Sequence, residues 1–195
     1  MNILQSLSGI VQRVNTAPDL QSALDIIVRD VREAMGTEVC TVYMADHGES
    51  RLVFTATEGL NREALGKLSL PFGQGLVGQV ALREESINTS NAQTDPNFQF
   101  LENIGEEPFN SFLGVPIVHH RRVLGVLVVQ QTDRRSFDES EEAFLLTMSA
   151  QLAGVIAHAQ ATGMLDTSAN ANVANAEFRG IAGASGVAKI GRAHV

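Results

Sequence analysis

The sequence predicts an α+β domain in α/β/α layers, in which an antiparallel sheet is flanked by helices from the N- and C-terminal parts of the chain. Apolar residues recur at helical spacing in both of these parts. Two stretches between them are rich in β-branched residues around short turns, as hairpins are. The expected segments are terminal helices at 2–15, 19–35 and 139–162, a short helix at 76–83, and hairpins at 38–57 and 112–131.

Several residues mark where these helices begin and end. Pro18 ends the first helix, because proline cannot continue one, and Asp19 is a good N-cap for the second. Gly36 suits the left-handed position that ends many helices. Asp-Glu-Ser-Glu at 138–141 forms a capping box that begins the last helix.

The predicted strands differ in how many polar side chains they contain. Residues 123–131 are almost all apolar, which predicts that the second hairpin is the central strand pair and is covered on both faces. Short extended pieces are expected at 68–70 and 86–89. Residues 90–111 have few periodic apolar positions and predict a long loop with one helical turn, and such loops in compact domains are usually functional.

Length and composition indicate one domain followed by a tail. The chain has 195 residues, of which 44% are hydrophobic, so a core can form without disulfides or metal. The single cysteine, Cys40, excludes an intramolecular disulfide. We expect the domain to span 1–163, a linker of small polar residues to span 164–177, and a new region to begin at 178–195.

The charge of the chain limits its partners. The net charge is −8, which does not indicate a nucleic-acid-binding surface and disfavours binding to anionic membranes. The sequence has no uncharged apolar stretch of the roughly 18 residues that span a membrane, and its start does not resemble a signal peptide. We therefore expect a cytoplasmic protein without nucleic-acid or membrane partners.

No constellation for catalysis or metal binding stands out. The five histidines are scattered, and His119-His120 has no Cys, Asp or Glu nearby at metal-site spacing. Cys40 lies within a strand and is interpreted as a small core residue. The pattern Gly-x-Gly-x-x-Gly at 73–78 follows a strand too short for a dinucleotide-binding unit, so it predicts a turn that starts a helix. The sequence thus predicts no metal, no cofactor and no catalytic residue in this chain.

A polar loop beside the second hairpin is the candidate binding site. Amide and hydroxyl side chains crowd residues 88–98, opposite a sheet rich in small and apolar residues, and such a pocket would suit a small polar ligand. The alternative is a loop whose turns satisfy their own polar groups. The candidate ligand-binding residues are Thr89, Asn91 and Asp95 for polar contacts, with Phe98, Phe112 and Gly75 for the walls.

Residues 4–162 resemble a GAF domain. The segments that carry the resemblance are FGQGLVGQVA (72–81), INTSNAQTDPNF (87–98), FLGVPI (112–117), GVLVVQQ (125–131) and SFDESEEAFL (136–145). Together with TEVCTVYMADH (37–47), they are similar to the N-terminal GAF domain of nitrogen-branch Enzyme I, a phosphoenolpyruvate–protein phosphotransferase. The tail GIAGASGVAKIGRAHV (180–195) is similar to the start of that family's phosphotransferase part, although the proline of its A-S-P-G motif is missing.

This resemblance implies a regulatory role. In that family the GAF part senses nitrogen status, with glutamine and 2-oxoglutarate as proposed signals. The downstream part, with Mg²⁺, passes phosphate from phosphoenolpyruvate through its own histidine to a nitrogen-branch phosphocarrier. No histidine of this chain matches that one, so the resemblance implies a fragment that is not itself an enzyme. We expect a homodimer through helices 2–15 and 139–162. The alternative is a GAF scaffold that serves for dimerisation or partner docking and binds no ligand.

Overall fold

The computed structural model describes residues 3–96 and 109–165. Six strands form one sheet in the order β3-β2-β1-β6-β5-β4, and every neighbouring pair is antiparallel. The strands are β1 (Val39–Asp46), β2 (Arg51–Glu58), β3 (Ser69–Pro71), β4 (Ile87–Thr89), β5 (Ser111–His119) and β6 (Arg122–Gln131). The helices are α1 (Ile3–Asn15), α2 (Leu20–Met35), α3 (Gly75–Arg83) and α4 (Glu139–Leu165), with 3-10 turns η1 (Arg62–Ala64) and η2 (Ala92–Thr94). Both predicted hairpins and the predicted helices are confirmed.

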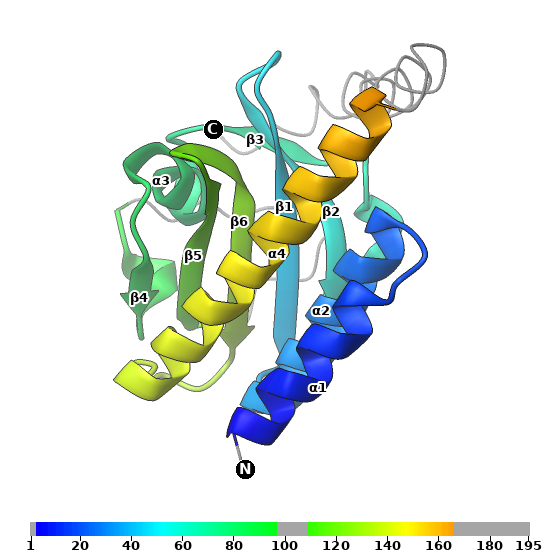
Figure 1. Cartoon of the computed structure of the whole chain (residues 1–195). Helices are drawn as coiled ribbons and strands as arrows, with labels where there is room; N and C mark the ends of the chain where they lie inside the picture. Colours follow the sequence, from blue (N-terminus) through cyan, green and yellow to red (C-terminus); the bar gives the residue numbers. More distant parts are fainter. Residues whose placement is uncertain (1–2, 97–108, 166–195) are drawn as a thin grey trace.

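Helices cover both faces of the sheet, which gives the three predicted layers. The helices α1, α2 and α4 pack on one face, and α3 lies on the other (Figure 1). Each interface has its own apolar core. The helix-side core lies beneath α1, α2 and α4 and includes Leu127 and Leu145, whereas the α3-side core includes Phe54 and Val80. The sheet therefore separates two cores and contributes side chains to both.

The centre of the sheet is formed by β1 and β6. Both strands of the second hairpin are covered on their two faces as predicted, but β6 rather than the hairpin as a whole is central, because its other neighbour is β1. Gly125 of β6 lies so close to β1 that a Cβ atom there would be 2.2 Å from the Tyr43 carbonyl oxygen. Only glycine permits this approach.

The helix ends follow the predicted capping residues. Asp19 accepts a hydrogen bond from the Ser22 backbone N–H at 2.7 Å, and Gly36 ends α2 with φ +66°. At the start of α4, Asp138 accepts from the Glu141 backbone N–H at 2.8 Å, and the Glu141 carboxylate accepts from the Asp138 backbone N–H at 3.1 Å. This reciprocal pair is the predicted capping box.

The Glu141 carboxylate should make the stability of the domain depend on pH. Arg135 donates to it through both terminal nitrogens, and this bond, with that from the Asp138 N–H, lowers the pKa of Glu141 below 4.5. A lowered folded-state pKa adds stability above the unfolded-state pKa, and that stability is lost as pH falls through the folded-state pKa. Glu141→Gln should therefore lower the free energy of unfolding by about 1 kcal/mol at neutral pH, since the pair is partly exposed. The difference from the unmodified chain should disappear as pH falls through the folded-state pKa of Glu141.

Thermal unfolding by circular dichroism at several pH values measures this difference. The control is Glu142→Gln in the same helical turn, whose side chain takes no part in the capping box and which should follow the unmodified chain throughout. A constant gap between Glu141→Gln and the unmodified chain across this pH range would contradict the role given to the carboxylate.

A buried carboxylate fastens α1 to α2. Asp30 is 7% exposed and accepts from the Arg13 Nε at 2.6 Å and from the Arg29 Nε at 3.2 Å. Both arginine side chains keep more than half of their surface in solvent, so the ion pairs bury only one charge. Ile10 and Val14 of α1 add apolar contacts in the helix-side core.

The last helix, α4, could cross a membrane by its length and composition alone. Its apolar residues instead pack on the sheet, and Leu145, Met148, Leu152 and Ile156 are fully buried there. We therefore describe α4 as a core helix of this domain. It extends to Leu165, two residues past the predicted domain end, and residues 166–195 lie outside the described part of the chain.

Candidate functional site

The predicted polar loop begins at the edge strand β4 and continues into η2. Thr89 is the last residue of β4 and pairs in register with Phe112 of β5. Asn91 and Asp95 flank η2 as its N-cap and C-cap residues. The structure thus brings these four candidate residues to one end of β5. Phe98 lies outside the described residues.

Two threonine hydroxyl groups of this loop take part in local turns. The Thr89 Oγ1 accepts from the Asn91 backbone N–H at 3.2 Å, and the Thr94 Oγ1 donates to the Asn91 carbonyl at 3.2 Å. These bonds agree with the alternative of a self-satisfied loop. One acceptor nearby is different: among the described residues, the buried Oδ1 of Asn110 has no hydrogen-bond partner, although the Asn110 backbone carbonyl accepts from the Ala92 N–H at 2.7 Å.

The walls of the candidate site lie at two different places. The Phe112 ring is buried in the α3-side core and lies over Gly114, where an added Cβ would be 2.8 Å from the ring and 3.2 Å from Val80. Gly75 starts α3 beside Phe72, whose N–H donates to the Ser50 carbonyl in the β1–β2 turn. Gly75 therefore lies toward the other end of the sheet from Thr89 and Phe112.

The glycine-rich segment is the structural turn that the sequence predicts. The Gly73 N–H donates to the Gly78 carbonyl at 2.8 Å, and the Gln79 Nε2 donates to the Gly73 carbonyl at 2.6 Å. An added Cβ at Gly78 would lie 2.8 Å from the Pro71 carbonyl oxygen. The glycines allow α3 to pack tightly on the chain that precedes it.

Two residues that the sequence analysis missed hold the loop in place. The Asn88 side chain donates to the Phe137 carbonyl at 2.8 Å and accepts from the Phe137 N–H at 3.2 Å, which joins β4 to the start of α4. The Ser111 hydroxyl accepts from the Arg135 N–H at 2.9 Å and also contacts the Asp133 and Arg135 carbonyls. A link between segments this far apart in sequence leaves no local pattern.

Cys40 is not placed to act as a nucleophile. It is fully buried in the helix-side core, and burial raises the pKa of its thiol far above the usual range. Among residues 3–96 and 109–165, no group of three or more His, Cys, Asp or Glu side chains is arranged to hold a metal ion.

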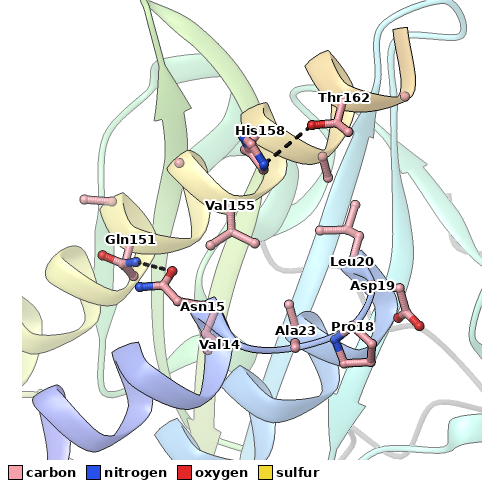
Figure 2. Close-up of a pocket in the computed structure, with 15 residues that line it drawn as sticks. Val14, Asn15, Pro18, Asp19, Leu20, Ala23, Gln151, Val155, His158 and Thr162 are labelled. Carbon is pink, nitrogen blue, oxygen red and sulfur yellow. Dashed lines mark hydrogen bonds between the residues drawn. The ribbon is translucent and has the colours of Figure 1, made fainter. Parts of the chain in front are cut away.

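A hollow lies on the helical face, where the sequence predicted no binding site. It has a volume of about 540 Å³ and lies between the α1–α2 connection and the C-terminal half of α4 (Figure 2). Val14, Leu20 and Val155 give it apolar walls. Gln151 crosses from α4 to donate to the Asn15 side chain at 3.0 Å. The hollow is therefore bounded by α1, α2 and α4, on the other side of the sheet from the polar loop.

These features define an α+β fold with helices on both faces of an antiparallel sheet, and comparison with known proteins identifies its family. The family model for the GAF domain matches residues 19–156. The chain belongs to the GAF domain family.

Within that family, the chain is similar to GAF domains of phosphoenolpyruvate-protein phosphotransferases. The solved domain from Coxiella burnetii is 43% identical, with a TM-score of 0.81, and covers 84% of this chain and 98% of its own. The Acinetobacter domain is 44% identical, with a TM-score of 0.76, and covers 83% of this chain and 96% of its own.

Curated full-length relatives give the same relationship. The Salmonella typhimurium and Escherichia coli proteins described as "Phosphoenolpyruvate-dependent phosphotransferase system" are each 41% identical over 162 residues, which is 83% of this chain. The chain spans about a fifth, 22%, of the length of these relatives.

Proposed function

We propose that this chain is a regulatory GAF domain that senses a small metabolite and controls a phosphoenolpyruvate-dependent protein phosphotransferase in the cytoplasm. The observation that carries this proposal is the identity of 43–44% with GAF domains of such phosphotransferases over nearly their full length. The chain itself performs no phosphotransfer in this proposal. Mg²⁺, phosphoenolpyruvate and the nitrogen-branch phosphocarrier are partners of the downstream region.

The candidate ligand is glutamine, with 2-oxoglutarate as the other possibility. The site would comprise Thr89, Asn91, Asp95, Phe98, Phe112 and Gly75. An amide ligand suits the described part of this site because the unpartnered Asn110 Oδ1 accepts hydrogen bonds and could receive an amide N–H. The Thr89 hydroxyl accepts its local bond through one lone pair, so its O–H would still be available to donate to the ligand.

In this proposal the regulatory domain forms a homodimer through α1 and α4. Leu4 on α1 and Leu146 on α4 are 75% and 40% exposed, which leaves apolar surface on both helices for a second copy. Ligand binding would then influence the downstream region through α4, to the extent that the ligand binds two states unequally.

Titration calorimetry of the 195-residue chain with L-glutamine tests the sensing proposal, with L-glutamate and 2-oxoglutarate as comparison ligands. We expect saturable heat with glutamine and none after Thr89→Val. The control is Thr16→Val, an exposed threonine in the opposite layer, which should bind as the unmodified chain does. Light scattering of the same samples measures whether the chain is a dimer.

The alternative function is a GAF scaffold that docks partners or dimerises without a ligand. The buried Phe112 ring, which fills space between β5 and α3, favours it. Absence of heat with all three compounds from a folded dimer would contradict glutamine sensing and support this alternative.

A further inference from the structure

The β5–β6 hairpin ends in a tight turn formed by two histidines followed by two arginines. His119 and Arg122 form the last cross-strand pair, and His120 and Arg121 connect them. His120, Arg121 and Arg122 are exposed, and the rings of His119 and His120 contact each other at 4.1 Å between centroids. We call His119–Arg122 the basic tip.

The backbone of the basic tip is unfavourable for the residues that occupy it. His120 and Arg121 have φ values of +48° and +64°, so two consecutive non-glycine residues adopt the left-handed conformation. Two-residue hairpin turns with this geometry strongly favour Asn-Gly, because a Cβ atom in this region clashes with the backbone. The turn therefore keeps His120 and Arg121 at a cost to local stability.

The arginine side chains of the basic tip have no partner among the described residues. The Arg121 and Arg122 side chains form no ion pair or hydrogen bond within residues 3–96 and 109–165, whereas four other arginines pair with carboxylates. Carboxylates are abundant, since the chain has 22 acidic and 14 basic residues. A pair of open guanidinium groups on an acidic protein is thus available to a partner outside it.

The basic tip is held rigidly at the end of the domain where α4 finishes. It is anchored by two long strands of the sheet, and the His47 Nε2 from the β1–β2 turn donates to the Val123 carbonyl at 2.7 Å. Since β1 and β5 both pair antiparallel to β6, their two turns lie at one end of the sheet, together with the C-terminal end of α4 (Figure 1). The backbone of the basic tip is therefore already ordered before a partner binds, which lowers the entropy cost of binding.

We propose that the basic tip docks a short acidic segment of a partner protein, which is a role beyond metabolite sensing. The size and surroundings of the tip favour this partner over nucleic acid or a membrane. A long polyanion would also contact the rest of the surface and be repelled by it, because the net charge of the chain is −8. A short segment of carboxylates would contact only the basic tip. Two guanidinium groups can each bind a carboxylate through paired hydrogen bonds.

Fluorescence anisotropy with a labelled octaglutamate peptide tests the docking surface on the full chain. We expect binding at about 20 mM salt that weakens at about 150 mM, because screening shortens the reach of exposed charges. Arg121→Ser with Arg122→Ser should reduce the affinity about tenfold. The control is Lys67→Ser with Arg83→Ser, two exposed cations without a described partner elsewhere on the surface, which should change it less than twofold.

A second variant separates binding from folding. His120→Asn with Arg121→Gly replaces the strained turn by the favoured one, so it should melt at a higher temperature than the unmodified chain and yet bind octaglutamate more weakly. No binding by the unmodified chain at low salt, an equal loss in the Lys67 and Arg83 control, or full binding by the Asn-Gly variant would overturn the proposal. Stronger competition by tripolyphosphate than by free octaglutamate would overturn the choice of a carboxylate partner.

Discussion

Gly125→Ala should destabilise the domain by about 3 kcal/mol or more, because the new methyl group would meet backbone rather than a movable side chain. Its Cβ would lie 2.2 Å from the Tyr43 carbonyl oxygen, between the two central strands of the sheet. Relief would require β1 and β6 to separate, and both cores depend on that pair. Urea unfolding followed by circular dichroism measures the loss.

The matched control for this substitution is Gly154→Ala. Gly154 lies within α4 and is exposed, with nothing within 4 Å of an added Cβ. Alanine there should stabilise the chain by about 0.5–1 kcal/mol, since glycine is a poor helix former. If both substitutions had similar small effects, the close approach of β1 and β6 at Gly125 would be wrong.

Asp30→Ala should cost about 2 kcal/mol and loosen α1. The substitution removes two charge-assisted hydrogen bonds, from Arg13 at 2.6 Å and from Arg29 at 3.2 Å. The two arginines are half-exposed and would be hydrated after the substitution. The loss in free energy of unfolding should therefore be smaller than that caused by an unpaired buried charge. Hydrogen exchange should show faster exchange in α1 than in the sheet, since α1 loses its polar tie to α2.

Asp25→Ala on the same helix is the control for Asp30. The Asp25 carboxylate accepts only from Gln21 in an exposed pair, so its removal should change the free energy of unfolding by less than about 0.5 kcal/mol. Equal losses for the two variants, or uniform exchange across the domain in Asp30→Ala, would show that Asp30 does not hold α1.

Features that arise from neighbours in sequence could be predicted. Asp19, Gly36 and the capping box at 138–141 act within a few residues of themselves, and each occupies the predicted helix end. The β-branched and apolar stretches around short turns likewise predicted both hairpins. Gly73 and Gly78 lie in the expected turn because its hydrogen bonds connect residues only five or six apart.

Features that depend on distant partners could not be predicted. The pairing of β1 with β6 joins residues more than 80 apart, so the sequence pointed to one hairpin as the centre instead of one strand from each. Asn88 bonds to Phe137 across 49 residues. Nothing in the sequence around Gly75 and Thr89 indicates that the fold places them far apart. The hollow beside α4 could not be predicted either, because it forms only where three helices meet.

The helices of the helical layer differ in length, and this difference affects how far the end of α4 would move if the helix tilted. α4 has 27 residues and is therefore roughly 40 Å long, whereas α1 and α2 have 13 and 16 residues. With its capping box as the pivot, a tilt of about 5° would move the far end of α4 by roughly 3 Å. A displacement too small to disturb the packing near the capping box would thus become a shift of nearly a carbon-to-carbon contact distance at the C-terminal end of α4, as in a lever.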